Sequence, residues 1–177
     1  MSNLLETLRQ IVQQEMRSLR SCELATVKEQ HPHADDGDND NYAVSVVLRD
    51  SGIVLKQVPL ATQRKGMASI PDVGDLVLVQ FVGGDINAPI VVGSLYNDED
   101  RPPLNKAGQY IVHLPLASDD KEAVTLVIDS QDQRSLTLNI GGGVTLTLID
   151  DDPVVKLDVA GGKTIIEIAR DGSLKLQ

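Results

Sequence analysis

The stretch VGDLVLVQFVGGDINAPIVVGSLYNDEDRPP, from Val73 to Pro103, carries the clearest strand pattern in this chain. Apolar and β-branched residues predominate over 75–82 and again over 88–96, and these short runs bounded by turn residues predict two β-strands. Between them, Gly83-Gly84-Asp85 supplies residues that readily adopt the positive φ angles of a hairpin turn. The acidic segment 98–106 then ends the pattern, because its two prolines donate no backbone hydrogen bond. The stretch therefore predicts a hairpin followed by the exit from a domain.

Upstream of this hairpin, three more segments show a similar strand pattern: CELATVK from Cys22, YAVSVVLRD from Tyr42 and IVLKQVP from Ile53. The tract Glu29–Asn41 is polar, acidic and rich in turn-forming residues, so it is predicted to be a surface loop. Five strands in so short a segment predict a small closed or half-closed barrel over residues 21–97. Closure removes the strand edges that would otherwise be exposed.

Residues 1–20 show a different pattern, in which apolar side chains recur at helical spacing with Gln, Arg and Glu between them. We expect an amphipathic helix, which either packs on its own domain or serves as a docking or bundling helix. Its apolar positions are Leu4, Leu5, Leu8, Ile11, Val12, Met16 and Leu19.

Beyond the linker at 98–106, short alternating segments recur throughout residues 107–177, separated by turns rich in Gly and Asp. They predict strands beginning at Val124, Ser135, Val144, Val154, Thr164 and Ser173. One side of these strands is aliphatic and consists of Leu136, Leu138, Ile140, Val144, Leu146, Leu148, Val155, Leu157, Val159, Ile166, Ile168, Leu174 and Leu176. The other side is polar and consists of Thr137, Asn139, Thr145, Thr147, Lys156, Asp158, Glu167 and Lys175.

No helix and no second set of strands follows in the sequence to cover this aliphatic side. Burying a Leu, Ile or Val stabilises a protein by roughly 1.5–3 kcal/mol, so leaving so many of them in water is untenable. We therefore expect three copies of residues 107–177 to form an intertwined trimeric β-helix, a triangular prism with the aliphatic side inward. The alternative is a monomeric β-solenoid or a meander packed on the barrel. The expected fold class is all-β with a short N-terminal helix.

Composition excludes several classes of function. The chain has 177 residues, a formal net charge of −10 and 2% aromatic residues. Its negative field repels phosphate backbones and anionic membrane surfaces, so we expect no nucleic-acid partner. Cys22 is the single cysteine, which excludes an internal disulfide. No signal sequence or membrane-spanning run is recognisable, so we expect synthesis in the bacterial cytoplasm.

Candidate reactive groups are few. His31 and His33 form a metal-like pair, but zinc needs three or four rigidly held ligands and this pair is predicted to lie in a flexible loop. Asp150, Asp151 and Asp152 are predicted to lie in a turn, where carboxylates stay hydrated instead of acting as an acid and a base. The glycine runs lack the Lys-Ser/Thr of a phosphate-binding loop, and no nucleophile motif is recognisable. We therefore expect no enzyme, no catalytic or metal-binding residues and no cofactor.

The stretch quoted first also resembles the baseplate spike proteins of contractile injection systems, a family that includes phage baseplate assembly protein V and the valine-glycine-repeat spikes of type VI secretion. The resemblance covers roughly residues 21–104 and extends to 107–177 in architecture only. The matching residues are Val73-Gly74-Asp75, Phe81–Asp85 in the pattern F-x-G-G-D, Pro89, Val91–Asn97 and Arg101-Pro102-Pro103.

The resemblance implies that residues 21–97 form an OB (oligonucleotide/oligosaccharide-binding) fold collar, and that residues 107–177 form a homotrimeric needle. It implies a central spike of a phage tail or tail-like particle, seated at its N-terminal end on a baseplate hub protein. Such a spike crosses the target envelope mechanically and carries a PAAR-type tip protein at its C-terminal end. This chain lacks a lysozyme-like insert at 98–106, a fused hub domain before the barrel, and a metal-binding His-x-His motif near Leu174–Gln177.

Two other functions stay open. A free-standing OB fold would bind single-stranded nucleic acid or an oligosaccharide, and nucleic-acid binding requires basic grooves and stacking aromatics. Besides Phe81 in an apolar strand, the chain offers Tyr42, Tyr96 and Tyr110 for stacking. An envelope-degrading enzyme is the second alternative, and turnover of peptidoglycan by the purified protein would favour it.

Overall fold

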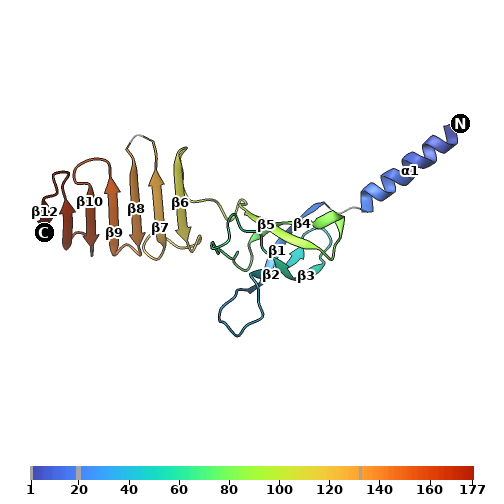
Figure 1. The fold of residues 1–177 in the computed structure, drawn as a ribbon, viewed down its shortest axis with the longest axis horizontal. Coiled ribbons are helices and arrows are strands. Elements are labelled where there is room, and N and C mark those ends of the chain that lie inside the picture. Colours follow the sequence, from blue (N-terminus) through green and yellow to red (C-terminus); the bar gives the residue numbers. More distant parts are fainter. Residues whose placement is uncertain (1, 19–20, 132) are drawn as a thin grey trace. The chain divides into compact units, whose positions relative to one another are not determined.

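The computed structural model describes residues 2–18, 21–131 and 133–177 (Figure 1). It divides into two compact units, with the division between Asn97 and Asp98. Of the apolar helix positions predicted above, Leu19 lies outside the described residues, and nothing is described of the Met16 side chain.

The N-terminal segment forms helix α1, Ser2–Ser18, as its apolar spacing predicted. At 3.6 residues per turn, its first apolar side chains fall on one side of the helix. Each of them is between 49% and 69% exposed, so this stripe is uncovered. The stripe consists of Leu4, Leu5, Leu8, Ile11 and Val12.

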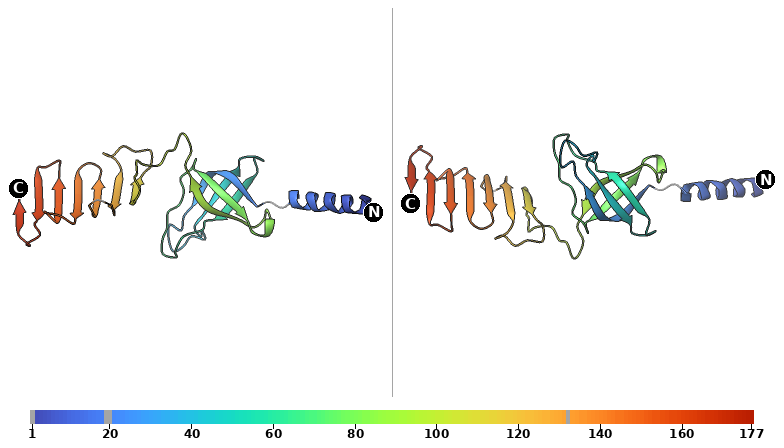
Figure 2. Two further views of the ribbon diagram at one scale, coloured as in Figure 1. Left: turned by 90° about the horizontal axis from the view of Figure 1, so that it is seen from above. Right: turned by 90° about the horizontal axis from the view of Figure 1, so that it is seen from below.

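The rest of the first unit is one curled antiparallel sheet with the strand order β3-β2-β1-β4-β5 (Figure 2). Its two outer strands approach each other where Leu60 forms a parallel bridge with Val91, and the Ala61 N–H donates to the Val91 carbonyl at 2.8 Å. No continuous ladder joins these outer strands, so the barrel is half-closed. The five strands are β1 Cys22–His31, β2 Ala43–Leu48, β3 Val54–Pro59, β4 Leu76–Phe81 and β5 Pro89–Leu95.

The barrel encloses an aliphatic core with a single aromatic side chain, Phe81. Alternate residues of each strand point inward, and every member of this core is at most 3% exposed. Burial of this set supplies the main stabilisation of the first unit. Its members are Ala25, Val27, Val44, Val46, Leu48, Val58, Val77, Val79, Phe81 and Val91.

Strand β1 is longer than the sequence predicted, because Glu29, Gln30 and His31 belong to it and not to the surface loop. Its register against β2 shifts between Val27 and Glu29, which marks a β-bulge. The bulge re-aims the chain and allows polar residues to continue the ladder. The Gln30 side chain is held there by donating to the Pro71 carbonyl at 2.7 Å.

The hairpin between β4 and β5 contains the predicted glycine turn in a wider form. Val82–Gly84 makes one turn of 3-10 helix, and Gly83 and Gly84 have φ angles of 64° and 79°. Only glycine takes such angles without strain. The Val82 N–H donates to the Ala88 carbonyl at 3.0 Å and closes the loop.

The second unit is a single seven-stranded antiparallel meander in which each strand pairs with its sequence neighbours (Figures 1 and 2). Six of the strands lie where the sequence predicted them, and β6 was missed. The strands are β6 Gln109–Leu114, β7 Val124–Asp129, β8 Ser135–Ile140, β9 Val144–Ile149, β10 Val155–Val159, β11 Thr164–Ile168 and β12 Leu174–Leu176.

This sheet has no core of its own within the described residues. Ala123, in the connection between β6 and β7, is its only hydrophobic residue in the buried class, and it is fully buried. All other buried hydrophobic residues lie in the first unit. The two units are therefore stabilised in different ways, and a single copy of the sheet lacks the burial that holds the barrel together.

We predict that Leu48→Ala lowers the free energy of unfolding of the barrel by about 2–5 kcal/mol, because it leaves a cavity in a fully packed site. Urea unfolding followed by circular dichroism measures this change. Leu24→Ala, at a position of the same barrel that is 36% exposed, is the matched control and should cost much less. Equal losses for the two variants would contradict the core described here.

Candidate functional site

The register of the seven-stranded sheet places three columns of side chains on one face. Every member is apolar except Thr164, and we call this surface the apolar face. The central column is Val112, Leu126, Leu138, Leu146, Leu157, Ile166 and Leu176. The flanking columns are Tyr110, Ile128, Leu136, Leu148, Val155, Ile168 and Leu174, and Leu114, Val124, Ile140, Val144, Val159 and Thr164. The aliphatic side predicted from the sequence is thereby confirmed as one continuous face.

The apolar face is incompletely covered in one copy of the chain. None of its side chains is in the buried class, and Leu174 and Leu176 in β12 are 62% and 67% exposed. Contiguous exposed apolar surface of this extent is rare in proteins that act alone. The face is therefore a candidate interaction surface.

The opposite face carries all the polar residues predicted for it, and we call it the polar face. On it, Glu167 lies between two lysines, with its carboxylate oxygens 3.9 Å from Lys156 Nζ and 3.5 Å from Lys175 Nζ. Exposed pairs of this kind add little stability but keep the surface hydrated. Four apolar residues that the sequence did not predict there also lie on this face: Ile111, Val127, Ile149 and Ile165.

The three aspartates considered as a carboxylate cluster stabilise turns. The Asp150 carboxylate is shared between the guanidinium groups of Arg134 and Arg170, and its Oδ1 lies 2.9 Å from Arg170 Nη2. Asp152 accepts the Arg170 backbone N–H at 3.0 Å, and Asp151 accepts from the Gln133 side chain at 2.8 Å. These bonds tie neighbouring turns together along one edge of the sheet.

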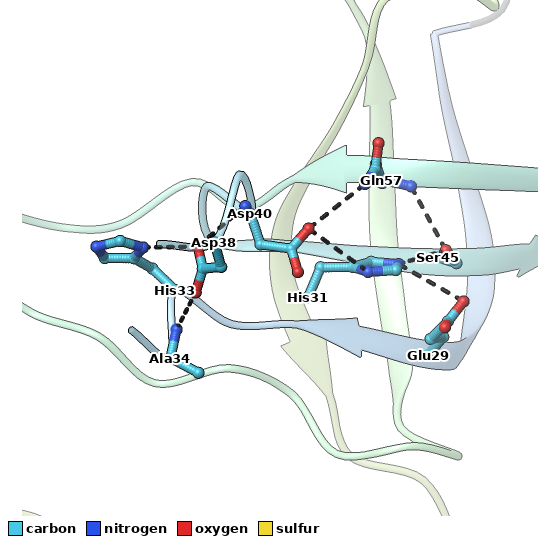
Figure 3. A network of polar contacts seen from close by, with 8 residues as sticks. All are labelled: Glu29, His31, His33, Ala34, Asp38, Asp40, Ser45 and Gln57. Atoms are coloured by element: carbon cyan, nitrogen blue, oxygen red, sulfur yellow. Dashed lines mark hydrogen bonds and ion pairs between the residues drawn. The ribbon is translucent and has the colours of Figure 1, made fainter. Parts of the chain in front are cut away.

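The structure separates the two histidines that formed the metal-like pair (Figure 3). His31 lies in β1, and its Nε2 is 2.8 Å from the Ser45 hydroxyl; Glu29 and Asp40 lie 3.7 and 4.0 Å from its ring. His33 lies in the loop, and its Nδ1 is 2.8 Å from Asp38 Oδ1. Within the described part of the chain, no group of three or more His, Cys, Asp or Glu side chains is arranged to hold a metal ion.

Asp38 organises the loop that follows β1. Its Oδ2 accepts the backbone N–H groups of Ala34 and Asp35 at 2.6 and 3.0 Å, while its Oδ1 accepts that of Asp40 at 3.1 Å. The hydrogen bond from His33, followed by that from the Asp35 backbone, lowers the pKa of Asp38 from 3.8 to about 2. The acidic tract is therefore a hydrogen-bonded turn built around one carboxylate.

Residues 27–96 match the family described as the type VI secretion system/phage-baseplate injector OB domain. The match spans the half-closed barrel from within β1 to the end of β5. Over these residues the chain is similar to the injector OB domain of phage baseplates and type VI secretion systems, which supports the resemblance noted from its sequence. No curated protein matches the chain. Among the described residues, no helix is long and apolar enough to cross a bilayer.

We predict that the Asp38 carboxyl titrates with a midpoint of about 2 in the folded protein, below the ordinary 3.8. Because folding lowers this pKa, ionised Asp38 stabilises the turn fully at pH values above the ordinary aspartate pKa of 3.8. The stabilisation is lost as the pH falls from there toward the folded-state pKa. Carbon-13 NMR of the side-chain carboxyl measures the midpoint. His33→Ala should move it toward 3.8, whereas His31→Gln, which does not touch Asp38, should leave it in place. An ordinary midpoint in the unsubstituted protein would contradict the contact.

Proposed function

We propose that this protein is the central spike of a contractile injection machine, in which three copies assemble a needle from residues 107–177. The observation that carries the proposal is the apolar face: seven strands keep their apolar residues in register, and nothing within the second unit covers them. Two further copies of the same face supply the missing cover. The match of residues 27–96 to the injector OB domain of phage baseplates and type VI secretion systems supports this role.

The width of the sheet suits a triangular prism. Strands of five residues, such as β10 and β11, span about 17 Å at ~3.3 Å per residue. In a triangle with sides of about 17 Å, each wall lies about 5 Å from the axis, or half the ~10 Å between packed sheets. Leucines predominate in the central column, which would fill this axis. Because each strand pairs with its neighbours in the same chain, each copy would supply one continuous wall.

The proposed partners follow the two ends of the spike. The half-closed barrel and the uncovered stripe of α1 would seat the trimer on a separate baseplate hub protein. Strand β12, with its two exposed leucines and an unpaired outer edge, would receive a PAAR-type tip protein. Such a cap would satisfy the backbone groups that the last strand leaves open.

In this role the protein works by transmitting force and not by catalysis. We propose that it has no enzymatic activity, that it meets the target membrane only during mechanical penetration, and that it is assembled into the baseplate of a phage tail or tail-like particle. The alternating charges on the polar face would keep the outside of the needle hydrated.

We predict that Leu146→Asp prevents assembly. The substitution would place three like charges on the dry axis, and an unpaired buried charge costs several kcal/mol. Multi-angle light scattering of the purified protein measures the mass: the unsubstituted protein should show three times the chain mass of 19.1 kDa, and the variant should not.

The matched control is Thr147→Asp, which introduces the same charge at the next residue of β9, on the polar face. This variant should keep the threefold mass. A twofold mass of the unsubstituted protein would contradict the trimer and would indicate two sheets packed face to face. A threefold mass of the Leu146→Asp variant would show that the apolar face is not the interface between the copies.

A further inference from the structure

The two lateral edges of the seven-stranded sheet are chemically different. One edge carries the turns 130–134, 150–154 and 169–173, which contain most of the charged residues of the turns beyond β7, and we call it the acidic edge. The other carries the turns 141–143 and 160–163, which are built mainly of glycine, and we call it the glycine edge. It also carries the connection 115–123 between β6 and β7, which contains Asp119, Asp120, Lys121 and Glu122. The difference indicates that the edges have different neighbours.

Turns on opposite edges are offset from each other by one strand. In an antiparallel meander, consecutive turns alternate between the two edges. The turn 141–143 therefore lies at the height of β8 and β9, between the heights of the acidic-edge turns 130–134 and 150–154. The turn 160–163 lies in the same way between 150–154 and 169–173. Each glycine turn thus has a gap at its own height on the opposite edge.

The gap between the turns 130–134 and 150–154 is a shallow, wide-open groove of about 580 Å³ on the acidic edge. Its apolar lining includes Ile128, Leu136 and Leu148, all members of one flanking column of the apolar face. Its polar lining consists of Asp129, Ser130, Arg134, Ser135 and Asp150. The groove is thus continuous with the apolar face and suits an apolar protrusion with little side-chain bulk.

The glycine edge presents such a protrusion. Ile140 and Val144 flank the turn 141–143, and Ile140 is half exposed. Gly141 and Gly142 have positive φ angles of 55° and 64°, and a β-carbon added at Gly141 would lie 3.1 Å from the Lys121 carbonyl oxygen, so the turn itself requires glycine at these two positions. At Gly143 an added β-carbon would meet its nearest neighbouring atom at 4.0 Å, and glycine there keeps the turn free of side-chain bulk.

The charged residues of the turn 160–163 and of the acidic-edge turns on either side of its height are also complementary. Lys163 in the turn 160–163 has no ion pair within the described residues. The two acidic-edge turns that flank its height contain Asp150, Asp151 and Asp152 in one turn and Asp171 in the other. Across one chain these groups lie at opposite ends of strands of about 17 Å, so Lys163 does not reach them there.

We propose that the glycine edge of one copy docks against the acidic edge of the next. The turn 141–143 with Ile140 and Val144 fills the groove over Ile128, Leu136 and Leu148, and Lys163 reaches the aspartates of the flanking turns. When three copies are related by a threefold axis, the glycine edge of one copy meets the acidic edge of the next at each corner of the prism. The contact is therefore head-to-tail, and the ring of copies closes after the third. This inference rests on the proposed trimer and names the surfaces that join it.

A carbodiimide that links amines directly to carboxylates tests the contact in the unsubstituted protein. Equal amounts of nitrogen-14 and nitrogen-15 chains are denatured together and refolded, and mass spectrometry then separates links between chains from links within one. We expect mixed-isotope links from Lys163 to the segment 150–152 or to Asp171, and covalent trimers on a denaturing gel. The Glu167 pairs with Lys156 and Lys175 are internal controls, because they should link within one chain.

The matched variant is Lys163→Arg, which keeps the positive charge but forms no stable link. It should retain the threefold native mass and lose the links to the acidic edge. If the native mass is threefold and the control pairs react, but Lys163 links elsewhere or not at all, the edge-to-edge docking is wrong while the proposed spike stands. A native mass equal to one chain would contradict both the edge-to-edge docking and the proposed trimeric spike.

Discussion

The constraint that governs this molecule is the lack of any second layer over the apolar face of β6–β12. A β-sheet is stable when at least one face is buried, and the barrel meets this condition inside one chain by curling its five strands around Val46, Val77 and their neighbours. The second unit stays flat, and Ala123 is the one hydrophobic residue in its described part that is buried. One chain thus contains a sheet that is complete and another that needs a partner. In the proposed trimer, the burial that folds the second unit would also be the burial that assembles it.

The turns preserve this apolar face by keeping every strand in phase. Side chains alternate with a period of two, so adding one residue in a strand would move all following side chains to the other face. Glycines at 141–142 and 161–162 take positive φ angles and reverse the chain tightly. Asp158, Asp151 and Asp171 accept backbone N–H groups within the turns and fix their shape. The small, polar turn residues thus maintain the register on which the large apolar residues depend.

Much of this organisation could be predicted from the sequence, because period-two alternation and Gly or Asp turns are local signals. The five barrel strands, six of the seven strands beyond the linker and the helix all follow from them. Strand β6 was missed because Ile111 interrupts the alternation of Tyr110, Val112 and Leu114. The end of β1 was missed because Glu29, Gln30 and His31 resemble loop residues, and only pairing with β2 across a bulge makes them a strand.

The site was less accessible to sequence analysis than the fold. Leu136 or Leu148 could be assigned to an aliphatic side from alternation alone, but the groove they form with Arg134 and Asp150 depends on how turns from different hairpins align. The separation of His31 from His33 likewise depends on contacts with Ser45 and Asp38 that lie outside any local motif. Such contacts become visible only when the register between strands is known.

The direction of the ladder bonds in β6–β12 has a mechanical consequence. Inter-strand hydrogen bonds run perpendicular to the strands, and therefore along the direction in which β6 to β12 succeed one another. Compression along that direction presses neighbouring strands together, and the same force acts on the hydrogen-bond ladder between each pair of strands. Tension in the same direction would instead peel off the short terminal strand first, since three strand residues and Gln177 hold β12 to β11. The meander is thus better suited to being driven forward than to being pulled back.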